Sequence, residues 1–132
     1  MIAELPPVRI MYVASDKGIS GSEEAFTKLE SRLQSLKARK FYGLIFGTPP
    51  EETYWACAAV RDGEQPEAIG LKTDIIPGGR YAIRRIHDWE HHIESIGNVF
   101  RDIISSHPFD PSRPCVEFYH GTNYLVVRVP VQ

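Results

Sequence analysis

The sequence predicts an α+β fold in which duplicated β-α-β-β units are related by a pseudo-twofold axis. Antiparallel sheets, two main helices and a pocket at the seam between the units are expected. Short apolar segments alternate with Gly- and Pro-rich turns, two longer segments have apolar residues at helical spacing, and the order of elements occurs twice. The 132 residues, 42% hydrophobic and 24% charged, match one globular domain covering residues 1–132.

Six segments are predicted to be strands because each is short, apolar and bounded by turn residues. They are residues 8–14, 41–46, 54–60, 80–86, 115–119 and 125–131, and residues 71–76 are a candidate for a further short strand. The segment 41–46, for example, runs into Gly47-Thr48-Pro49-Pro50, a strong break in any strand.

Two segments are predicted to be helices. The first begins near Ser20, whose spacing to Glu23 is that of a capping box, and the basic residues 37–40 are expected at its C-terminus. The second is expected over residues 89–104, with Asp88 as a candidate cap. The residues expected on the inner helix faces are Phe26, Leu29, Leu33, Leu36, Ile93, Ile96, Phe100, Ile103 and Ile104.

The duplication is visible in residues as well as in element order. Phe46-Gly47-Thr48 corresponds to His120-Gly121-Thr122 at a shift of 74 residues, and Phe26 matches Phe100 at the same shift. The repeats are expected at about 6–62 and 71–132. One such unit has too little core to be stable alone, so the two should pack together and form a concave site at their seam.

Charge and hydropathy exclude several classes of function. The net charge of -2 argues against a protein that coats nucleic acids, which would carry a basic excess. No apolar run approaches the ~20 residues that span a bilayer, and no secretory signal is visible. Cys57 and Cys115 lack metal-type spacing and are expected to be reduced thiols. We therefore expect a cytoplasmic protein with no nucleic-acid or membrane partner.

Neither a metal nor a cofactor is expected. His87 and His91 have the i, i+4 spacing of helical metal ligands, but the sequence fixes no third ligand, and a solvated helix start is the favoured interpretation. No glycine-rich phosphate loop and no Ser-His-Asp arrangement can be recognised.

Glu117 is the most informative residue for function. It lies in the middle of the apolar segment 115–119, where an ionised carboxylate is rare because burial is costly without a partner. Its equivalent in the first half is Gly43, which would leave volume beside the carboxylate. A place in the pocket is the favoured interpretation, and a solvent-facing strand or an ion pair with Arg128 or Arg84 are the alternatives.

Aromatic residues are expected to complete this site. Phe41 and Tyr119 share the predicted strand face of Glu117, and Trp55 lies in the strand equivalent to that of Arg128. A carboxylate among aromatic rings suits a flat, cationic or polarised aromatic ligand. The predicted ligand-binding residues are Glu117, Tyr119, Trp55, Trp89, Phe41 and Arg128.

Several segments together resemble a known family, the GyrI-like small-molecule-binding domain. They are RYAIRR after IIPGG, IESIGNVFRDI, and PCVEFY followed by VRVPV, in a doubled β-α-β-β order. The same domain forms the effector-binding part of AraC- and MerR-type multidrug regulators. The resemblance covers nearly the whole chain and implies a pocket for lipophilic, often cationic compounds, with Glu117 matching the glutamate at its centre.

The resemblance implies three functions. The leading hypothesis is a stand-alone module that binds or sequesters lipophilic or cationic aromatic compounds, with a role in xenobiotic resistance. Some family members hydrolyse electrophilic cyclopropane-bearing genotoxins, and Glu117 would then be catalytic; another member inhibits DNA gyrase. The chain departs from the family at Arg128, where a tyrosine is common. The sequence leaves open whether the chain forms a homodimer.

Overall fold

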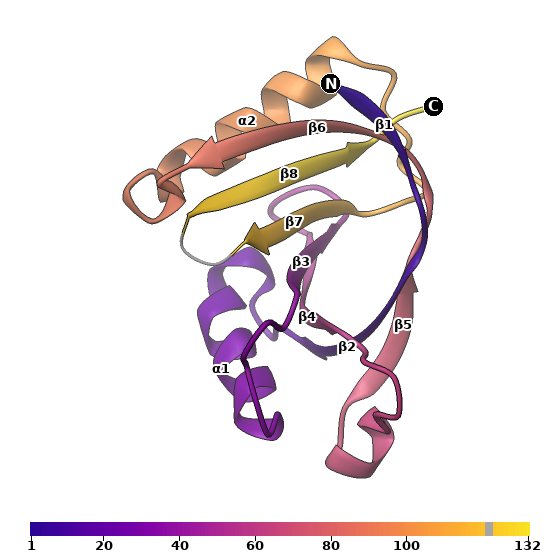
Figure 1. Ribbon diagram of the computed structural model, residues 1–132. Helices are drawn as coiled ribbons and strands as arrows, with labels where there is room; N and C mark the ends of the chain where they lie inside the picture. Colours follow the sequence, from indigo (N-terminus) through magenta and orange to yellow (C-terminus); the bar gives the residue numbers. More distant parts are fainter. Residues whose placement is uncertain (121–122) are drawn as a thin grey trace.

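A single curled sheet of eight antiparallel strands organises the part of the chain that the computed structural model describes, residues 1–120 and 123–132 (Figure 1). The strand order is β1-β6-β8-β7-β3-β4-β2-β5. The strands are β1 (Ile2–Leu5), β2 (Val8–Ala14), β3 (Phe41–Phe46), β4 (Thr53–Ala59), β5 (Lys72–Ile76), β6 (Gly79–His87), β7 (Cys115–His120) and β8 (Tyr124–Pro130). The helices are α1 (Ser22–Arg32) and α2 (Ile93–Ser106), and neither is long and apolar enough to cross a membrane.

The sheet is symmetric about the β3–β7 pair, which confirms the predicted fold class. The series β2, α1, β3 and β4 is repeated by β6, α2, β7 and β8, and the sheet order reads the same outward from its centre. Gly43 and Glu117, equivalent by the shift of 74, are direct partners in this central pair. The part of the repeat match that falls on Gly121 and Thr122 lies outside the described residues.

Two edge strands extend the predicted unit. The strand β5 lies where a further short strand was expected, whereas β1 was not predicted. Each pairs with the other half of the molecule, because β1 joins β6 and β5 joins β2. Two linkers cross between the halves, one from β1 to β2 and one from β5 to β6. They approach each other at Gly78, where a Cβ would lie 2.9 Å from the Cδ of Pro7. This crossing ties the two units into one body.

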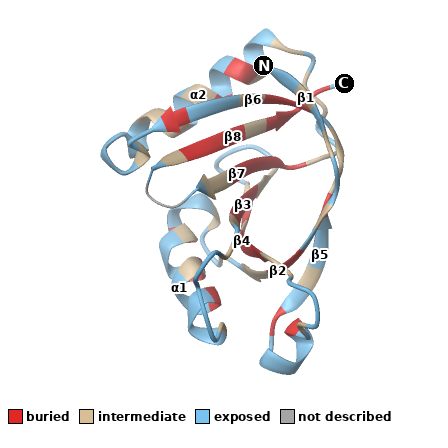
Figure 2. Ribbon diagram, viewed as in Figure 1, coloured by how far each residue is buried: buried red, intermediate tan, exposed pale blue. Residues whose placement is uncertain are grey.

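Both helices cover the same face of the sheet. Buried residues of β6, β8 and α2 form one cluster, and those of β2, β4 and α1 form another. A third cluster on the opposite face unites residues from both ends of the sheet, such as Ile10, Tyr81 and Val116, because the sheet curls around them. In Figure 2 the buried positions concentrate in the central strands. The central strands β3 and β7 therefore lie between the part of the sheet that α1 covers and the part that α2 covers.

The helix ends differ from the sequence prediction. A 3-10 turn, Gly18–Gly21, precedes α1, and the Ser20 hydroxyl donates to the Lys17 carbonyl at 2.7 Å, so the predicted capping box is wrong. A 3-10 turn, Trp89–His91, likewise precedes α2. Asp88 has a left-handed backbone with φ of 53° and its carboxylate contacts the His91 ring, so it does not cap the helix.

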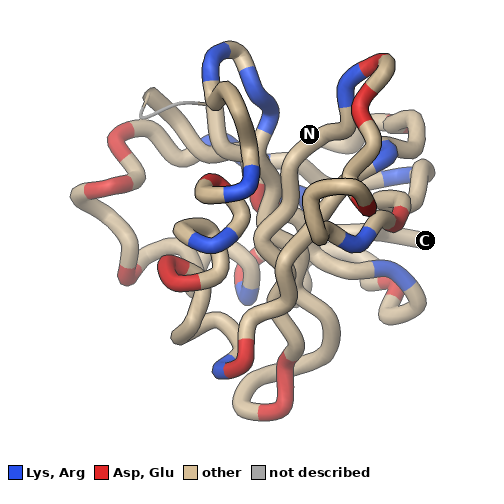
Figure 3. The backbone as a smooth tube through the Cα atoms, turned by 90° about the horizontal axis from the view of Figure 1, so that it is seen from below, with Lys and Arg blue, Asp and Glu red and all other residues tan. Residues whose placement is uncertain are grey.

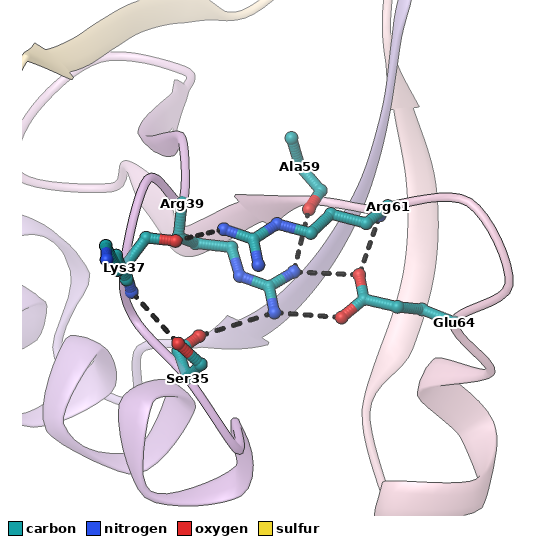
Figure 4. Close-up of polar contacts among 6 residues, drawn as sticks. All are labelled: Ser35, Lys37, Arg39, Ala59, Arg61 and Glu64. Carbon is teal, nitrogen blue, oxygen red and sulfur yellow. Dashed lines mark hydrogen bonds and ion pairs between the residues drawn. The ribbon is translucent and has the colours of Figure 1, made fainter.

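The basic segment 37–40 is not a helix terminus, because α1 already ends at Arg32. Arg39 instead turns inward, with a side chain only 3% exposed (Figure 4). Its guanidinium binds both oxygens of Glu64, at 2.7 and 2.8 Å, and donates to the Ala59 carbonyl at 3.3 Å. This two-pronged ion pair fixes the loop after α1 to the end of β4.

Candidate functional site

A cavity of about 670 Å³ lies between α1 and α2, over the centre of the sheet. Its volume falls in the range of about 300–1,000 Å³ that small-molecule sites occupy. The described residues that line it are Ile19, Ser22, Glu23, Phe26, Thr27, Glu30, Phe41, Ile45, Tyr54, Trp89, Ile93, Ile96, Gly97, Phe100, Glu117 and Tyr119. The two helices supply the walls and β3, β4 and β7 the floor, which is the seam predicted from the duplication.

Glu117 lies on the floor of the cavity, with 6% of its surface exposed. Its Oε1 accepts hydrogen bonds from the hydroxyls of Tyr54 at 2.7 Å and Tyr119 at 2.8 Å. Among the described residues nothing donates to its second oxygen, Oε2, and no Lys, Arg or His forms an ion pair with the carboxylate. One carboxylate oxygen is thus held by the protein, while the other has no hydrogen-bond partner among the described residues.

Two interpretations of Glu117 that the sequence allowed are wrong. A side chain that is 94% buried does not point to solvent. The arginines are engaged elsewhere, because Arg84 binds Asp102 of α2 at 2.7 Å and Arg128 lies over the rings of Phe118 and Tyr42. The geometry agrees with the favoured interpretation, in which the carboxylate of Glu117 lies in the pocket.

Burial raises the pKa of Glu117 above its ordinary value, although the two tyrosine hydrogen bonds act in the opposite direction. Burial, together with the neighbouring carboxylate, also raises the pKa values of Tyr54 and Tyr119, so both phenols stay protonated and donate. The same two causes raise the pKa of Cys115 to about 11. The site therefore disfavours further negative charge on all of these groups.

Glycine at position 43 makes this arrangement possible. A Cβ at Gly43 would collide with the hydroxyl of Tyr54 and with Oε1 of Glu117. The volume that the sequence predicted beside the carboxylate is therefore partly filled, by a phenol from the adjacent strand β4. The absence of one side chain on β3 is what lets β4 reach across to β7.

The aromatic residues of the cavity form one connected wall. Phe26 of α1 meets Tyr119 edge to face, with ring centroids 5.5 Å apart, and also contacts Tyr54 and Phe41 at 6.3 Å each. On the other side Trp89 contacts Tyr119 at 5.2 Å. Its indole N–H is buried and has no hydrogen-bond partner among the described residues. Aromatic rings from two sides of the cavity thus pack against the tyrosines that hold the carboxylate.

Trp55 and Arg128 are not in the cavity, so the prediction that they share a site with Glu117 is wrong. Trp55 stacks on Tyr12, with ring centroids 3.8 Å apart, on the opposite face of the sheet. The register explains both errors. Glu117 pairs with Val127, so Arg128 points to the other face, and Tyr54 takes the cavity face of β4, so Trp55 does not.

The remaining four predicted residues, Glu117, Tyr119, Trp89 and Phe41, do line the cavity. The sequence reasoning missed Tyr54, and it also missed two acidic residues of α1, Glu23 and Glu30. The signal for Tyr54 was its strand alternation with Ala56 and Ala58, whose small side chains leave room under α1. The signal for the two glutamates was their spacing of seven residues, which places them on one helix face.

The charge of the cavity differs from that of the molecule. Charged positions of both signs are spread around the backbone (Figure 3). The described residues that line the cavity, by contrast, include three glutamates and no Lys, Arg or His. The cavity is thus an apolar and aromatic pocket with negative charge only.

Comparison with known proteins shows which solved structures share this fold. No family model and no curated protein matches the sequence. Among solved structures, the integron cassette protein VCH_CASS2 from the mobile metagenome of Vibrio cholerae has a TM-score of 0.74 at 13% identity, covering 100% of this chain and 95% of that one. SAV2435 bound to tetraphenylphosphonium has a TM-score of 0.63 at 11% identity, covering 100% and 93%. A hydrolase from Listeria innocua has a TM-score of 0.62 at 9% identity, covering 100% and 91%. Such identities show a shared fold.

Proposed function

We propose that this protein is a GyrI-like module that binds lipophilic cations between α1 and α2, with Glu117 as their counterion. The observation that carries the proposal is the free Oε2 of a buried carboxylate, which faces an aromatic cavity without a cationic partner among the described residues. The fold is shared with SAV2435, whose structure holds tetraphenylphosphonium, and this supports the same ligand class here.

The physics of the site favours a cation with a large apolar surface. An unpaired carboxylate in an apolar cavity is costly, and a cation that enters removes this cost by pairing with it. The surrounding rings of Tyr119, Phe26 and Trp89 add cation–π attraction and apolar contact. Small hydrated cations would gain little, because they keep water and leave the rings uncovered.

Two ions of the same shape and opposite charge test this proposal. Tetraphenylphosphonium and tetraphenylborate present the same four phenyl groups, so shape and hydrophobicity are matched. We expect isothermal titration calorimetry to detect binding of tetraphenylphosphonium and little or none of tetraphenylborate. Equal affinities for the two ions would contradict charge recognition.

The variant Glu117→Gln tests the residue itself. The amide oxygen can still accept from Tyr54 and Tyr119, so the shape of the floor is kept while the charge is lost. We expect tetraphenylphosphonium to bind with a loss of about 1–3 kcal/mol, roughly 5- to 150-fold. Glu24→Gln, an exposed position of α1 outside the cavity lining, is the matched control and should bind as the original chain does.

A second candidate function is hydrolysis of an electrophilic compound. The raised pKa of Glu117, beside the Tyr119 hydroxyl, is the observation that favours it. A carboxylate of this kind can take a proton from water while the water oxygen bonds to an electrophilic carbon, here of a strained cyclopropane whose ring bond breaks and which then receives the proton. Mass spectrometry would detect the added water, and turnover no faster than that of Glu117→Ala would exclude this function.

A further inference from the structure

The wall of the cavity that α1 forms has two carboxylates that the proposed function does not use. Glu23 and Glu30 both line the cavity and are exposed. Seven residues separate them, so they lie on the same face about 10 Å apart along the helix axis. Neither forms an ion pair within the described chain, whereas their neighbour Glu24 binds Lys28 at 3.5 Å.

An aromatic layer separates these exposed carboxylates from the buried one. Phe26 lies between Glu23 and Glu30 on the helix, and its ring packs against Tyr54 and Tyr119. Those two tyrosines are the residues that hold Oε1 of Glu117. Negative charge therefore occurs at two levels, the solvent-exposed face of α1 and the buried floor, with rings between them.

The opposite wall has no charge. The described cavity residues of α2 are Ile93, Ile96, Gly97 and Phe100. A ligand would therefore place its apolar surface against α2 and its positive groups toward α1 and the floor. This asymmetry points to a ligand with more than one positive group.

We propose that the preferred ligands are elongated dications, with an aromatic cation at Glu117 and a second positive group held by Glu23 and Glu30. This inference rests on the proposed function, because Glu117 must first bind a cation. The free, buried Oε2 of Glu117 fixes one end of the ligand, and the exposed glutamates select for the other. A monocation can neutralise only the floor.

Ethidium and propidium are suitable probes, because they share one aromatic cation and propidium has a second, quaternary ammonium group on a short chain. At low ionic strength we expect propidium to bind about tenfold more tightly than ethidium, as two exposed ion pairs allow. The double variant Glu23→Gln/Glu30→Gln should remove this advantage by weakening propidium alone. Glu24→Gln is the control on the same helix and should preserve the advantage.

Salt provides an independent readout, because exposed charges are screened. In about 1 M salt, where the Debye length is about 3 Å, the affinities of the two dyes should converge. Fluorescence titration measures both dyes in the same way.

The outcomes separate this inference from the proposed function. Equal affinities of the two dyes for the original chain, or an advantage of propidium that persists in the double variant, would overturn the dication inference and leave the role of Glu117 intact. If neither dye binds, or if Glu117→Gln weakens neither, the proposed function fails and the inference fails with it.

Discussion

The buried carboxylate of Glu117 should make the stability of the fold depend on pH in a specific direction. Its pKa in the folded protein lies above the ordinary value of 4.5, because burial penalises the charged form. Between the ordinary and the raised value, the folded state therefore binds more protons than the unfolded state does. The contribution of Glu117 to stability is fully present below the ordinary pKa and is lost as the pH rises through the raised one.

The variant Glu117→Gln isolates this contribution, because an amide does not titrate while its oxygen can still accept from both tyrosines. The difference in unfolding free energy, variant minus original, should grow by about 1.4 kcal/mol for each pH unit across the window and become constant above it. Other titrating groups are common to both chains and cancel in the difference. The variant should therefore gain stability relative to the original chain as the pH rises from acidic to neutral values.

Urea unfolding followed by circular dichroism at a series of pH values measures this difference. Glu23→Gln, which removes an exposed carboxylate from the same cavity, is the control for the loss of one negative charge. Parallel stability curves for Glu117→Gln and the original chain would refute the reasoning, because they would mean that the carboxylate is as well solvated in the folded state as in the unfolded state.

Ligand binding should also be coupled to the protonation of Glu117. A cation at Oε2 favours the charged carboxylate, so tetraphenylphosphonium should release a proton when it binds within that pH window. Calorimetry in buffers of different ionisation enthalpy measures the release. The apparent affinity for tetraphenylphosphonium should fall as the pH is lowered through the raised pKa of Glu117. Glu117→Gln should abolish both the proton release and the pH dependence of the affinity.

Three further variants test the architecture around the site. Gly43→Ala places a Cβ against the carboxylate of Glu117 and should destabilise the fold by about 1–3 kcal/mol in urea unfolding; an unchanged midpoint would contradict the tight packing. Arg39→Ala removes both prongs of the pair with Glu64, which is 29% exposed, and should cost about 1–3 kcal/mol. Gly97→Ala, where a Cβ meets only the end of one side chain at 3.8 Å, should raise stability by up to about 1 kcal/mol. Gly97→Leu should instead narrow the cavity that Gly97 lines and weaken tetraphenylphosphonium binding.

Local patterns were sufficient to predict most elements of this fold. The segment of β3 was predicted from its apolar run and the break at Gly47, both of which are local signals. The strand β1 was not, because its four residues have little strand character and are ordered by pairing with β6, about 80 residues away in the chain. The helix ends were also missed, because a hydroxyl such as that of Ser20 can bond a nearby carbonyl instead of capping the helix.

Four of the predicted residues line the cavity, and the two at its centre follow from chemistry within one strand. Glu117 stands out as a carboxylate in an apolar run, and Tyr119 follows from alternation. The partners on other strands depend on register, where one residue moves a side chain to the opposite face. Trp55 was assigned to the face that Tyr54 occupies, and this error of one position is invisible until the pairing of β3 and β4 is known.

The position of Glu117 has a consequence for how such a site can exist in a duplicated fold. Gly43 and Glu117 occupy equivalent positions in the two repeats and are also paired with each other across β3 and β7. The pseudo-twofold axis therefore passes through this pair. Two glutamates here would place like charges side by side in a buried environment, and two glycines would leave no charge at all. Only an asymmetric pair supplies one buried carboxylate. Because Gly43 has no side chain, the hydroxyl of Tyr54 can occupy that space and donate to Glu117. The chemistry of the cavity thus depends on a difference between the two units at the position of the β3–β7 pair where equivalent residues are direct partners.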